Sequence, residues 1–492
     1  GADSGSIATT NNIVDNGTLI FNHSDPLILA KAISGSGNLI KAGSGSLRLT
    51  ATNTYTGATI ISTGTLIIGD GATSGSIANT SDIVDNGELV FDRTDPLTQA
   101  GAISGAGHLT QNGTGTVTLT GENTYGGLTT INNGTLVIGD GAGNGSIGNT
   151  SGIIDSGILK FNRGNNLTVA QVISGSGQVI QDGNGTGVLT LIGANTYTGQ
   201  TTITSGTLVV GDGGENGSIN ATSAIVDNGI LKFNRSDNIT VAQVISGTGN
   251  LLKDGTGSLR LTATNTYSGS TSINTGNLII GDSATSGSIA NTSGIVDNGE
   301  LTFDRTDPLT QAVAISGTGK VTQNGTGSVT LTGENTYQGT TTIARGTLIV
   351  GDGSTSGSIA NTSDIVDNGT LKFNRNDPIS LNKVISGTGN LIQDGNGSGV
   401  LTLTANNTYT GTTTITSGGL VVGDGATSGS IFASSDIVNN ANLTFNRSDD
   451  TNYTGNLSGS STANLTKTGT GVLSMSGNCL LYTSPSPRDQ RG

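Results

Sequence analysis

The sequence has 492 residues, 81 of them glycine, and a formal net charge of −14. This negative charge argues against binding to nucleic acid or to an anionic membrane surface, and no run of about 18 apolar residues exists that could form a membrane-spanning helix. Glycine, asparagine, threonine and serine form helices weakly and occur in nearly every segment, so the composition favours many short strands.

The chain opens with a motif that returns along its length. "GADSGSIATTNNIVDNG" at Gly1 matches "GATSGSIANTSDIVDNG" at Gly71, and both a tripeptide Asn-Thr-Tyr and a phenylalanine recur with a period of about 70 residues. The tripeptide begins at Asn53, Asn123, Asn195, Asn265, Asn335 and Asn407, and the phenylalanines are Phe21, Phe91, Phe161, Phe233, Phe303, Phe373 and Phe445. "SLRLTATNTY" occurs at Ser46 and again three units later at Ser258, so three units were copied as a block.

Each unit divides into three segments of about one coil each. Between Thr65 and Gly134 these segments begin at Thr65, Glu88 and His108, and each ends at glycine. In "ELVFD" from Glu88 and "TVTLT" from Thr116, apolar residues alternate with polar ones, which is the period of a half-buried strand. The pattern predicts an all-β fold, a right-handed parallel β-helix of about 20 coils with three short strands per coil, in which each coil closes the open backbone hydrogen bonds of the next.

The regular array ends near the carboxyl terminus. We therefore divide the chain into a β-helical repeat array over residues 1–478 and a tail over residues 479–492. The segment "CLLYTSPSPRD" from Cys479 to Asp489 resembles the translation of a sequencing adapter. We expect this tail to be non-native, and we exclude the only cysteine from arguments about redox chemistry or anchoring.

Two acidic positions recur once per unit and are the first candidates for chemistry. The "VDNG" motif contains Asp15, Asp85, Asp227, Asp297 and Asp367, and the "GD" motif contains Asp70, Asp140, Asp212, Asp282, Asp352 and Asp424. Polysaccharide hydrolysis needs carboxylates that converge on one substrate, whereas copies three coils apart would lie about 14 Å from one another. We therefore expect turn carboxylates that cap backbone N–H groups, and we assign no catalytic residue.

An arginine follows the phenylalanine in six units, and in most of them an aspartate comes two residues later. The arginines are Arg93, Arg163, Arg235, Arg305, Arg375 and Arg447, and the aspartates are Asp95, Asp237, Asp307, Asp377 and Asp449. A solvated row of ion pairs is the expected arrangement. A strip that binds sugars or anions is the alternative.

The sequence indicates no metal or cofactor site. "DGNGTG" at Asp182 lacks a third carboxylate, and Gly193 stands where a calcium loop carries its glutamate. His23 and His108 are not repeated and have no cysteine partner, which argues against zinc. Ligand-binding residues stay unassigned.

Threonine and tyrosine suggest two further surface hypotheses. Threonine rows such as "TVTLT" occur in one coil of three, so a continuous ice-binding plane is not expected, and threonine suits the surface of a strand. In Asn-Thr-Tyr, we expect the asparagine to cap a corner and the tyrosine to lie over a neighbouring coil with its hydroxyl in water. A row of exposed tyrosines that contacts sugars is the alternative.

The segment Gly107–Asp140, "GHLTQNGTGTVTLTGENTYGGLTTINNGTLVIGD", is similar to the autotransporter-associated β-strand repeat, and Gly37–Asp70 and Gly319–Asp352 match nearly as well. The resemblance implies a passenger region of a type V secreted protein of Gram-negative bacteria. It also implies an upstream signal sequence and a downstream outer-membrane β-barrel, which this sequence does not contain, so we expect membrane attachment only through that barrel. The family motif carries no catalytic residue.

We therefore expect a non-enzymatic, surface-exposed stalk or adhesin-type passenger that extends material from the outer membrane. The expected partners are host or environmental surfaces and glycans, and further copies of the chain through exposed solenoid ends. The alternatives are the scaffold of a carbohydrate-active β-helix enzyme and an ice- or glycan-binding solenoid.

Overall fold

The computed structural model describes residues 11–432 and 435–481. These residues form short strands joined by turns, with no helix among them. Neighbouring strands are parallel, as where β10 (Glu88–Phe91) lies between β8 (Thr65–Ile68) and β13 (His108–Gln111). The fold is an all-β parallel solenoid of about 23 turns. The predicted class is confirmed, and the handedness stays a prediction.

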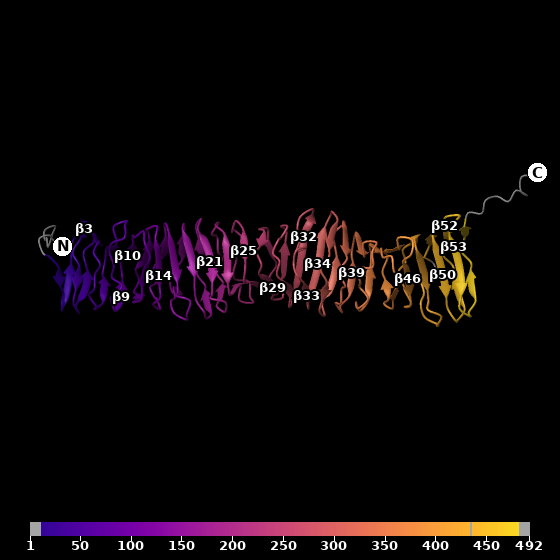
Figure 1. Cartoon of the computed structure of the whole chain (residues 1–492), viewed down its shortest axis with the longest axis horizontal. Coiled ribbons are helices and arrows are strands. Elements are labelled where there is room, and N and C mark those ends of the chain that lie inside the picture. Colours follow the sequence, from indigo (N-terminus) through magenta and orange to yellow (C-terminus); the bar gives the residue numbers. More distant parts are fainter. Residues whose placement is uncertain (1–10, 433–434, 482–492) are drawn as a thin grey trace, which may run out of the picture. The chain divides into compact units, whose positions relative to one another are not determined.

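Two compact units make up the chain, and Figure 1 shows strands in successive coils of each, with the first unit indigo to magenta and the second pink through orange to yellow. The first unit comprises Gly1–Asp237 and Gln243–Leu251, and the second comprises Asn238–Ala242 and Leu252–Gly492. The boundary falls inside the repeat array, at β27 (Ile239–Val241) and β29 (Asn250–Asp254).

Each sequence repeat contributes eight strands. The first full set comprises β2 (Thr18–Phe21), β3 (Leu27–Leu29), β4 (Ile33–Ser34), β5 (Asn38–Lys41), β6 (Ser46–Leu49), β7 (Thr59–Ile61), β8 (Thr65–Ile68) and β9 (Asp82–Asp85). The Asn-Thr-Tyr stretch forms only an isolated bridge, between Thr52 and Ser76 in this repeat. Some coils therefore hold fewer than the three predicted strands.

Three sequence repeats make ten coils. In the first unit, one row of positions runs through Ile13, Ile33, Asn53 and Ser76, and then through Leu97, Val117, Leu136, Leu159, Val179, Thr201 and Ile225. No strand pairing among the described residues joins Ser76 to Leu97, and the two coils are linked nearby by the Thr94 N–H, which donates to the Ala72 carbonyl at 3.0 Å. Ile13 and Ile225 head the same "IVDNG" motif and are three repeats apart. One repeat therefore makes about three and a third coils of about 21 residues each, and this shorter coil is why the turns exceed the predicted 20.

The fractional turn places equivalent motifs on different sides of the solenoid. Phe21 lies in β2, Phe91 in β10 and Phe161 in β18 (Ile158–Phe161), and these strands belong to three separate sheets. In the second unit, Phe303 in β34 (Glu300–Arg305) and Phe373 in β42 (Thr370–Phe373) are likewise in different sheets. A motif that recurs once in every sequence repeat therefore forms no continuous strip along one face.

The interior is a ladder of aliphatic residues. In β14 (Thr116–Leu119), Val117 and Leu119 are buried and alternate with half-buried threonines, as the sequence period predicts. Leu97, Val117 and Leu136 stack in register in consecutive coils. Each coil is too thin to bury this surface alone, so the stacking of coils supplies the core.

The tyrosine of the Asn-Thr-Tyr motif lies inside this core, and the prediction of a hydroxyl in water is wrong. Tyr125 is 1% exposed, and its hydroxyl lies 2.7 Å from Oγ1 of Thr129. The asparagine does cap a corner as expected, because Asn123 accepts the Ile103 N–H and donates to the Ser146 carbonyl, both at 2.9 Å. The other copies of the tyrosine are buried in the same way, which removes the hypothesis of an exposed tyrosine row.

Cys479 begins β55 (Cys479–Leu481), which pairs with β52 (Leu457–Gly459). The structure thus extends the array through Leu481, into the segment that we predicted to be a non-native tail. The remaining positions of that tail, 482–492, lie outside the described residues, and the division between array and tail stays a prediction.

Candidate functional site

Four of the five "VDNG" aspartates are among the most deeply buried acids of the described residues, and the fifth, Asp15, is 9% exposed. Asp85, Asp227, Asp297 and Asp367 are 0% exposed, and so is Asp155, which the motif search missed because its context is "IIDSG". Its place one repeat after Asp85 is the signal that identifies it. In each of these five residues Oδ1 accepts the N–H two positions later, as Asp85 does from Gly87 at 2.9 Å. The predicted turn cap is confirmed, and the burial was not foreseen.

The next coil closes over each carboxyl group. A Cβ atom placed on Gly107 would lie 2.4 Å from Oδ1 of Asp85, so only glycine allows the two coils this approach. Oδ2 of Asp85 has no hydrogen-bond partner, and the same holds for the other four buried copies. A charged oxygen without a partner is costly in such a place, and burial raises the pKa of the group instead.

Burial raises the pKa of four of these aspartates, Asp85, Asp155, Asp227 and Asp367, to about 6, against an ordinary value of 3.8. It raises the pKa of Asp297 to about 7, where the nearby Glu300 also contributes. The hydrogen bond from the following glycine opposes the shift in every copy. A carboxyl group with such a pKa can serve as a general acid, but these groups are sealed from substrate and act on stability instead.

The last copy of the motif replaces the aspartate by an amide. Asn439 is 0% exposed, and its Oδ1 accepts the Ala441 N–H at 3.1 Å, as the aspartates do in their own turns. Its Nδ2 donates to the Asn464 carbonyl at 2.9 Å. A neutral amide therefore occupies this turn, which fits a neutral carboxyl group in the other repeats.

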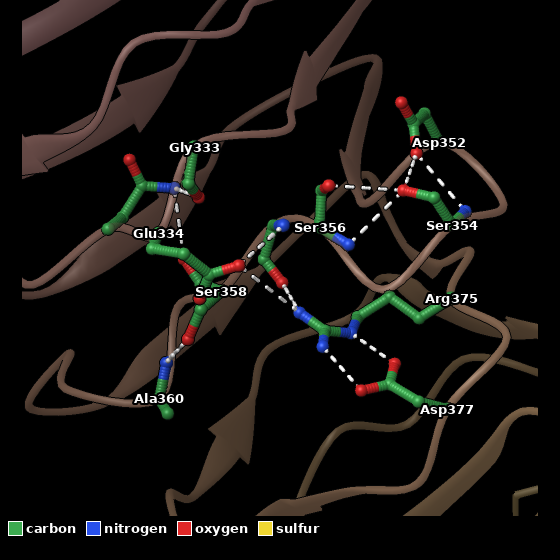
Figure 2. Close-up of polar contacts among 11 residues, drawn as sticks. Gly333, Glu334, Asp352, Ser354, Ser356, Ser358, Ala360, Arg375 and Asp377 are labelled. Atoms are coloured by element: carbon green, nitrogen blue, oxygen red, sulfur yellow. Dashed lines mark hydrogen bonds and ion pairs between the residues drawn. The ribbon is translucent and has the colours of Figure 1, made fainter.

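Five of the six "GD" aspartates are exposed caps, as predicted, namely Asp70, Asp140, Asp212, Asp352 and Asp424. The sixth, Asp282, is also exposed but lies within the longer strand β32 (Asn277–Ala284), where the structure shows no such cap. Asp70 accepts the Ala72 N–H at 3.1 Å. Figure 2 shows the fifth copy, where Asp352 accepts both the N–H of Ser354, at 3.1 Å, and its hydroxyl, at 2.6 Å. These bonds shape the loop that separates two strands, and the carboxylates stay in solvent.

The arginine side chains are mostly buried, so the prediction of a solvated row of ion pairs is wrong for the arginines. Arg375 donates from Nε and Nη2 to the two oxygens of Asp377, at 2.9 and 2.7 Å, and from Nη1 to the Gly357 carbonyl of the preceding coil (Figure 2). The hydrogen bonds from Arg375 hold the pKa of Asp377 below its ordinary value. The guanidinium group thus holds the loop against the preceding coil. Because successive copies of the arginine lie on different sides of the solenoid, they form no continuous anion-binding strip.

The remaining candidates from the sequence are not brought together. Asp182 forms an ion pair with Lys160 at 2.7 Å, and His108 accepts the Leu128 N–H at 2.8 Å. Within residues 11–432 and 435–481, no group of three or more His, Cys, Asp or Glu side chains could hold a metal ion. The row through Thr118 continues into Val137 and Lys160, so the threonines form no flat plane there.

Two cavities occupy equivalent places in consecutive repeats of the second unit. The smaller has a volume of about 210 Å³ and is lined by Glu334, Phe373, Arg375 and Leu381 among others. It lies where the isolated bridge at Ser358 leaves β43 (Ile379–Leu381) at the edge of its sheet. The larger, of about 520 Å³, is at the corresponding place one repeat later. Neither cavity was foreseen from the sequence.

Comparison with known protein families identifies the type of repeat. A family model described as "Passenger-associated-transport-repeat" matches residues 39–68, 109–138, 184–210, 251–280, 321–350 and 396–422. The chain carries passenger-associated transport repeats. Four of the six matches begin in a strand, and those from residues 184 and 396 begin in a turn. All six span the Asn-Thr-Tyr stretch and end directly before the "GD" motif. The predicted resemblance is thereby confirmed.

A similar protein supports the same relationship. The adhesin BmaC autotransporter of Brucella suis biovar 1 (strain 1330) is 32% identical in a match that covers 75% of this chain. The chain spans 13% of the length of that protein. No solved structure matches. The described residues form a parallel β-solenoid that carries passenger-associated transport repeats, and the chain is related to an adhesin autotransporter.

No helix in the described part of the chain is long and apolar enough to cross a membrane.

Proposed function

We propose that this passenger β-helix is a non-enzymatic stalk that extends material from the surface of a Gram-negative bacterium. The observation that carries the proposal is the ten-coil period of the first unit, in which three sequence repeats bring the same motif back to the same row of the stack. Each added coil lengthens such a stack by ~4.8 Å without enlarging its core. The isolated, sealed aspartates support a role without catalysis, since a glycoside hydrolase needs two accessible carboxyl groups.

The length of the stalk can be tested by deletions in the full-length protein on bacteria. Removal of residues 13–224 joins Asn12 to Ile225, takes out ten coils and should lower a tag on the amino-terminal side by ~48 Å. Removal of residues 13–82 joins Asn12 to Ile83 and should lower it by ~16 Å. Electron tomography of the gold-labelled tag measures both heights. Equal heights in the two variants and the parent would reject the stalk.

Exposure at the bacterial surface is a separate part of this proposal. It is supported by the passenger repeats and by the relationship to an autotransporter. Protease added to intact cells should cleave the array, while a periplasmic control protein stays intact. Cleavage only after the outer membrane has been permeabilised would contradict surface display.

Adhesion is the second candidate function, and the name of the BmaC adhesin is the observation that favours it. We propose host or environmental surfaces as the partners. Bacteria that display the full-length protein should bind to cultured cells or to glycan-coated beads more than bacteria that display the variant without residues 13–224. Equal binding by an unrelated displayed passenger would contradict specific adhesion.

A further inference from the structure

The larger cavity differs in chemistry from its counterpart one repeat earlier. The cavity with Glu334, Ala360, Ile379, Ser380 and Leu381 has about 210 Å³, and the later one, with Asn406, Phe432, Thr451, Asn452 and Tyr453 at the corresponding positions, has about 520 Å³. Small-molecule sites have volumes of roughly 300–1,000 Å³, so only the later cavity has the size of a ligand pocket.

Phe432 is an aromatic residue that the fold does not require. The same position holds Ala78, Gly148, Asn220, Ala290 or Ala360 in the other repeats. Its side chain is exposed, with a relative accessibility of 42%. The ring gives this cavity a flat apolar face that the cavity of the preceding repeat, with Ala360, does not have.

Two further aromatic rings form the wall behind this phenylalanine. Tyr453 and Phe445 both line the cavity and are 3% and 4% exposed, with ring centroids 6.2 Å apart. The tyrosine hydroxyl donates to the Ser435 carbonyl, which fixes the ring. The chain contains 16 aromatic residues in all, eight Tyr and eight Phe, so three at one cavity are a local concentration.

Most polar groups of the cavity are neutral or neutralised, and the exception is Asp450, whose carboxylate accepts the Val472 N–H at 2.8 Å and disfavours an anionic ligand. The carboxylate of Glu334 is replaced by the amide of Asn406, whose Oδ1 accepts the Gly429 N–H at 3.1 Å and whose NH₂ group is a further donor. Arg447 is paired with Asp449 at 2.7 Å and is bonded to the Gly429 carbonyl. Oγ1 of Thr451 is buried and has no hydrogen-bond partner, which is unfavourable until a polar group reaches it.

We propose that this cavity binds a neutral saccharide, with one pyranose ring against Phe432 and its hydroxyl groups on Asn406, Thr451 and Asn452. The C–H groups on one face of a pyranose are slightly positive and complement the negative face of an aromatic ring. Amides and hydroxyls can both donate to and accept from sugar hydroxyls. The assignment rests on the adhesion proposed above for its biological meaning, and it gives that adhesion a ligand class.

The purified 492-residue chain tests the site directly. Saturation-transfer NMR and calorimetry with methyl glucoside, methyl galactoside, methyl N-acetylglucosaminide and lactose should show saturable binding of at least one sugar at a single site. Phe432→Ala restores the residue of the preceding repeat, so it should keep the fold, and we expect it to weaken binding at least about tenfold. Thr451→Val keeps the shape and should weaken binding about threefold to tenfold.

The matched control is Ala360→Phe, which adds a ring beside the smaller cavity and should leave sugar binding unchanged. Binding of none of the four sugars would overturn the proposal. So would equal binding by the parent and Phe432→Ala, or binding of an apolar dye that the sugars do not displace. Adhesion of displaying bacteria is measured separately. If Phe432→Ala loses the sugar but the cells still adhere, the site stands and adhesion is carried elsewhere.

Discussion

The two recurring aspartates of a sequence repeat accept the same local hydrogen bond but lie in opposite surroundings, one buried and one exposed. Asp85 and Asp70 each accept the N–H two residues later, at 2.9 and 3.1 Å. Asp85 is covered by the next coil and is 0% exposed, whereas Asp70 lies in an exposed loop. The turn sequence therefore determines the hydrogen bond, and the neighbouring coil determines whether the carboxyl group can be ionised without cost.

The largest expected effect of this difference is on the pH dependence of stability. The folded-state pKa of the buried aspartates is about 6 to 7, above the ordinary 3.8, so the native state binds their protons more tightly than the unfolded chain. Their favourable contribution is complete below about pH 4 and is lost as the pH rises through 6 to 7. A shift of about two units corresponds to ~3 kcal/mol for each copy.

Denaturant midpoints measured between pH 4 and 8 check this prediction. We expect the midpoint to fall as the pH rises through this range. For Asp85, the charged neighbours His108 and Glu88 act in opposite directions and leave burial as the dominant cause. A midpoint that rises across this range would show that the buried groups are stabilised as carboxylates.

Asn439→Asp should create the buried acid that the last repeat lacks. The substitution removes the donor to the Asn464 carbonyl and places two oxygens against each other at neutral pH. We expect a loss of ~3 kcal/mol at pH 8 and a smaller loss at pH 4, where the new group carries a proton. Hydrogen exchange of the amides around β49 (Ile437–Asn439) reports the loss locally. Equal losses of stability at pH 4 and pH 8 would show that ionisation of the new aspartate is not their cause.

Gly107→Ala tests the close approach of the covering coil. The new Cβ would lie 2.3 Å from Cγ of Asp85, and the backbone has to move to admit it. We expect a loss of ~2 kcal/mol. The matched control is Gly148→Ala, where the added Cβ has no atom within 4 Å. Hydrogen exchange should show a loss of amide protection in Gly107→Ala only. Similar protection in both variants would mean that the covering coil does not approach Asp85 closely.

The smallest expected effect comes from Asp227→Asn. The amide cannot ionise, which relieves ~3 kcal/mol at pH 8. Its NH₂ group replaces Oδ2, which has no partner, and costs roughly 1–3 kcal/mol unless it reaches a backbone carbonyl, as Nδ2 of Asn439 does in its own turn. We expect the free energy of unfolding to rise by about 1 kcal/mol at pH 8. Its slope against pH should also be smaller, by the amount that corresponds to one bound proton. Asp212→Asn, in the exposed loop of the same unit, should change stability by at most ~0.5 kcal/mol. If the pH dependence of stability in Asp227→Asn is unchanged, the assignment of a raised pKa to Asp227 is refuted.

Much of the architecture could be predicted because it depends on neighbours in the sequence. The alternation in "TVTLT" at Thr116 fixes which side of a strand is apolar, and glycine and asparagine fix the corners. The caps at Asp70 and Asp85 are local turn contacts and were likewise predictable. In the candidate site, the concentration of Phe432 and Tyr453 in one repeat was visible in the sequence as a departure from the other copies, although no cavity could be inferred from it.

The sequence by itself determined the long repeat period, the parallel β-solenoid and the passenger-type repeat. Only the tertiary structure decided that one repeat turns through about three and a third coils, because this phase depends on which strands pair from one coil to the next. It also decided the burial of Tyr125, Asp85 and Arg375, whose partners or covers come from other coils. Local propensity specifies a strand or a turn, whereas solvent access and the balance of charge depend on what the next coil places over it.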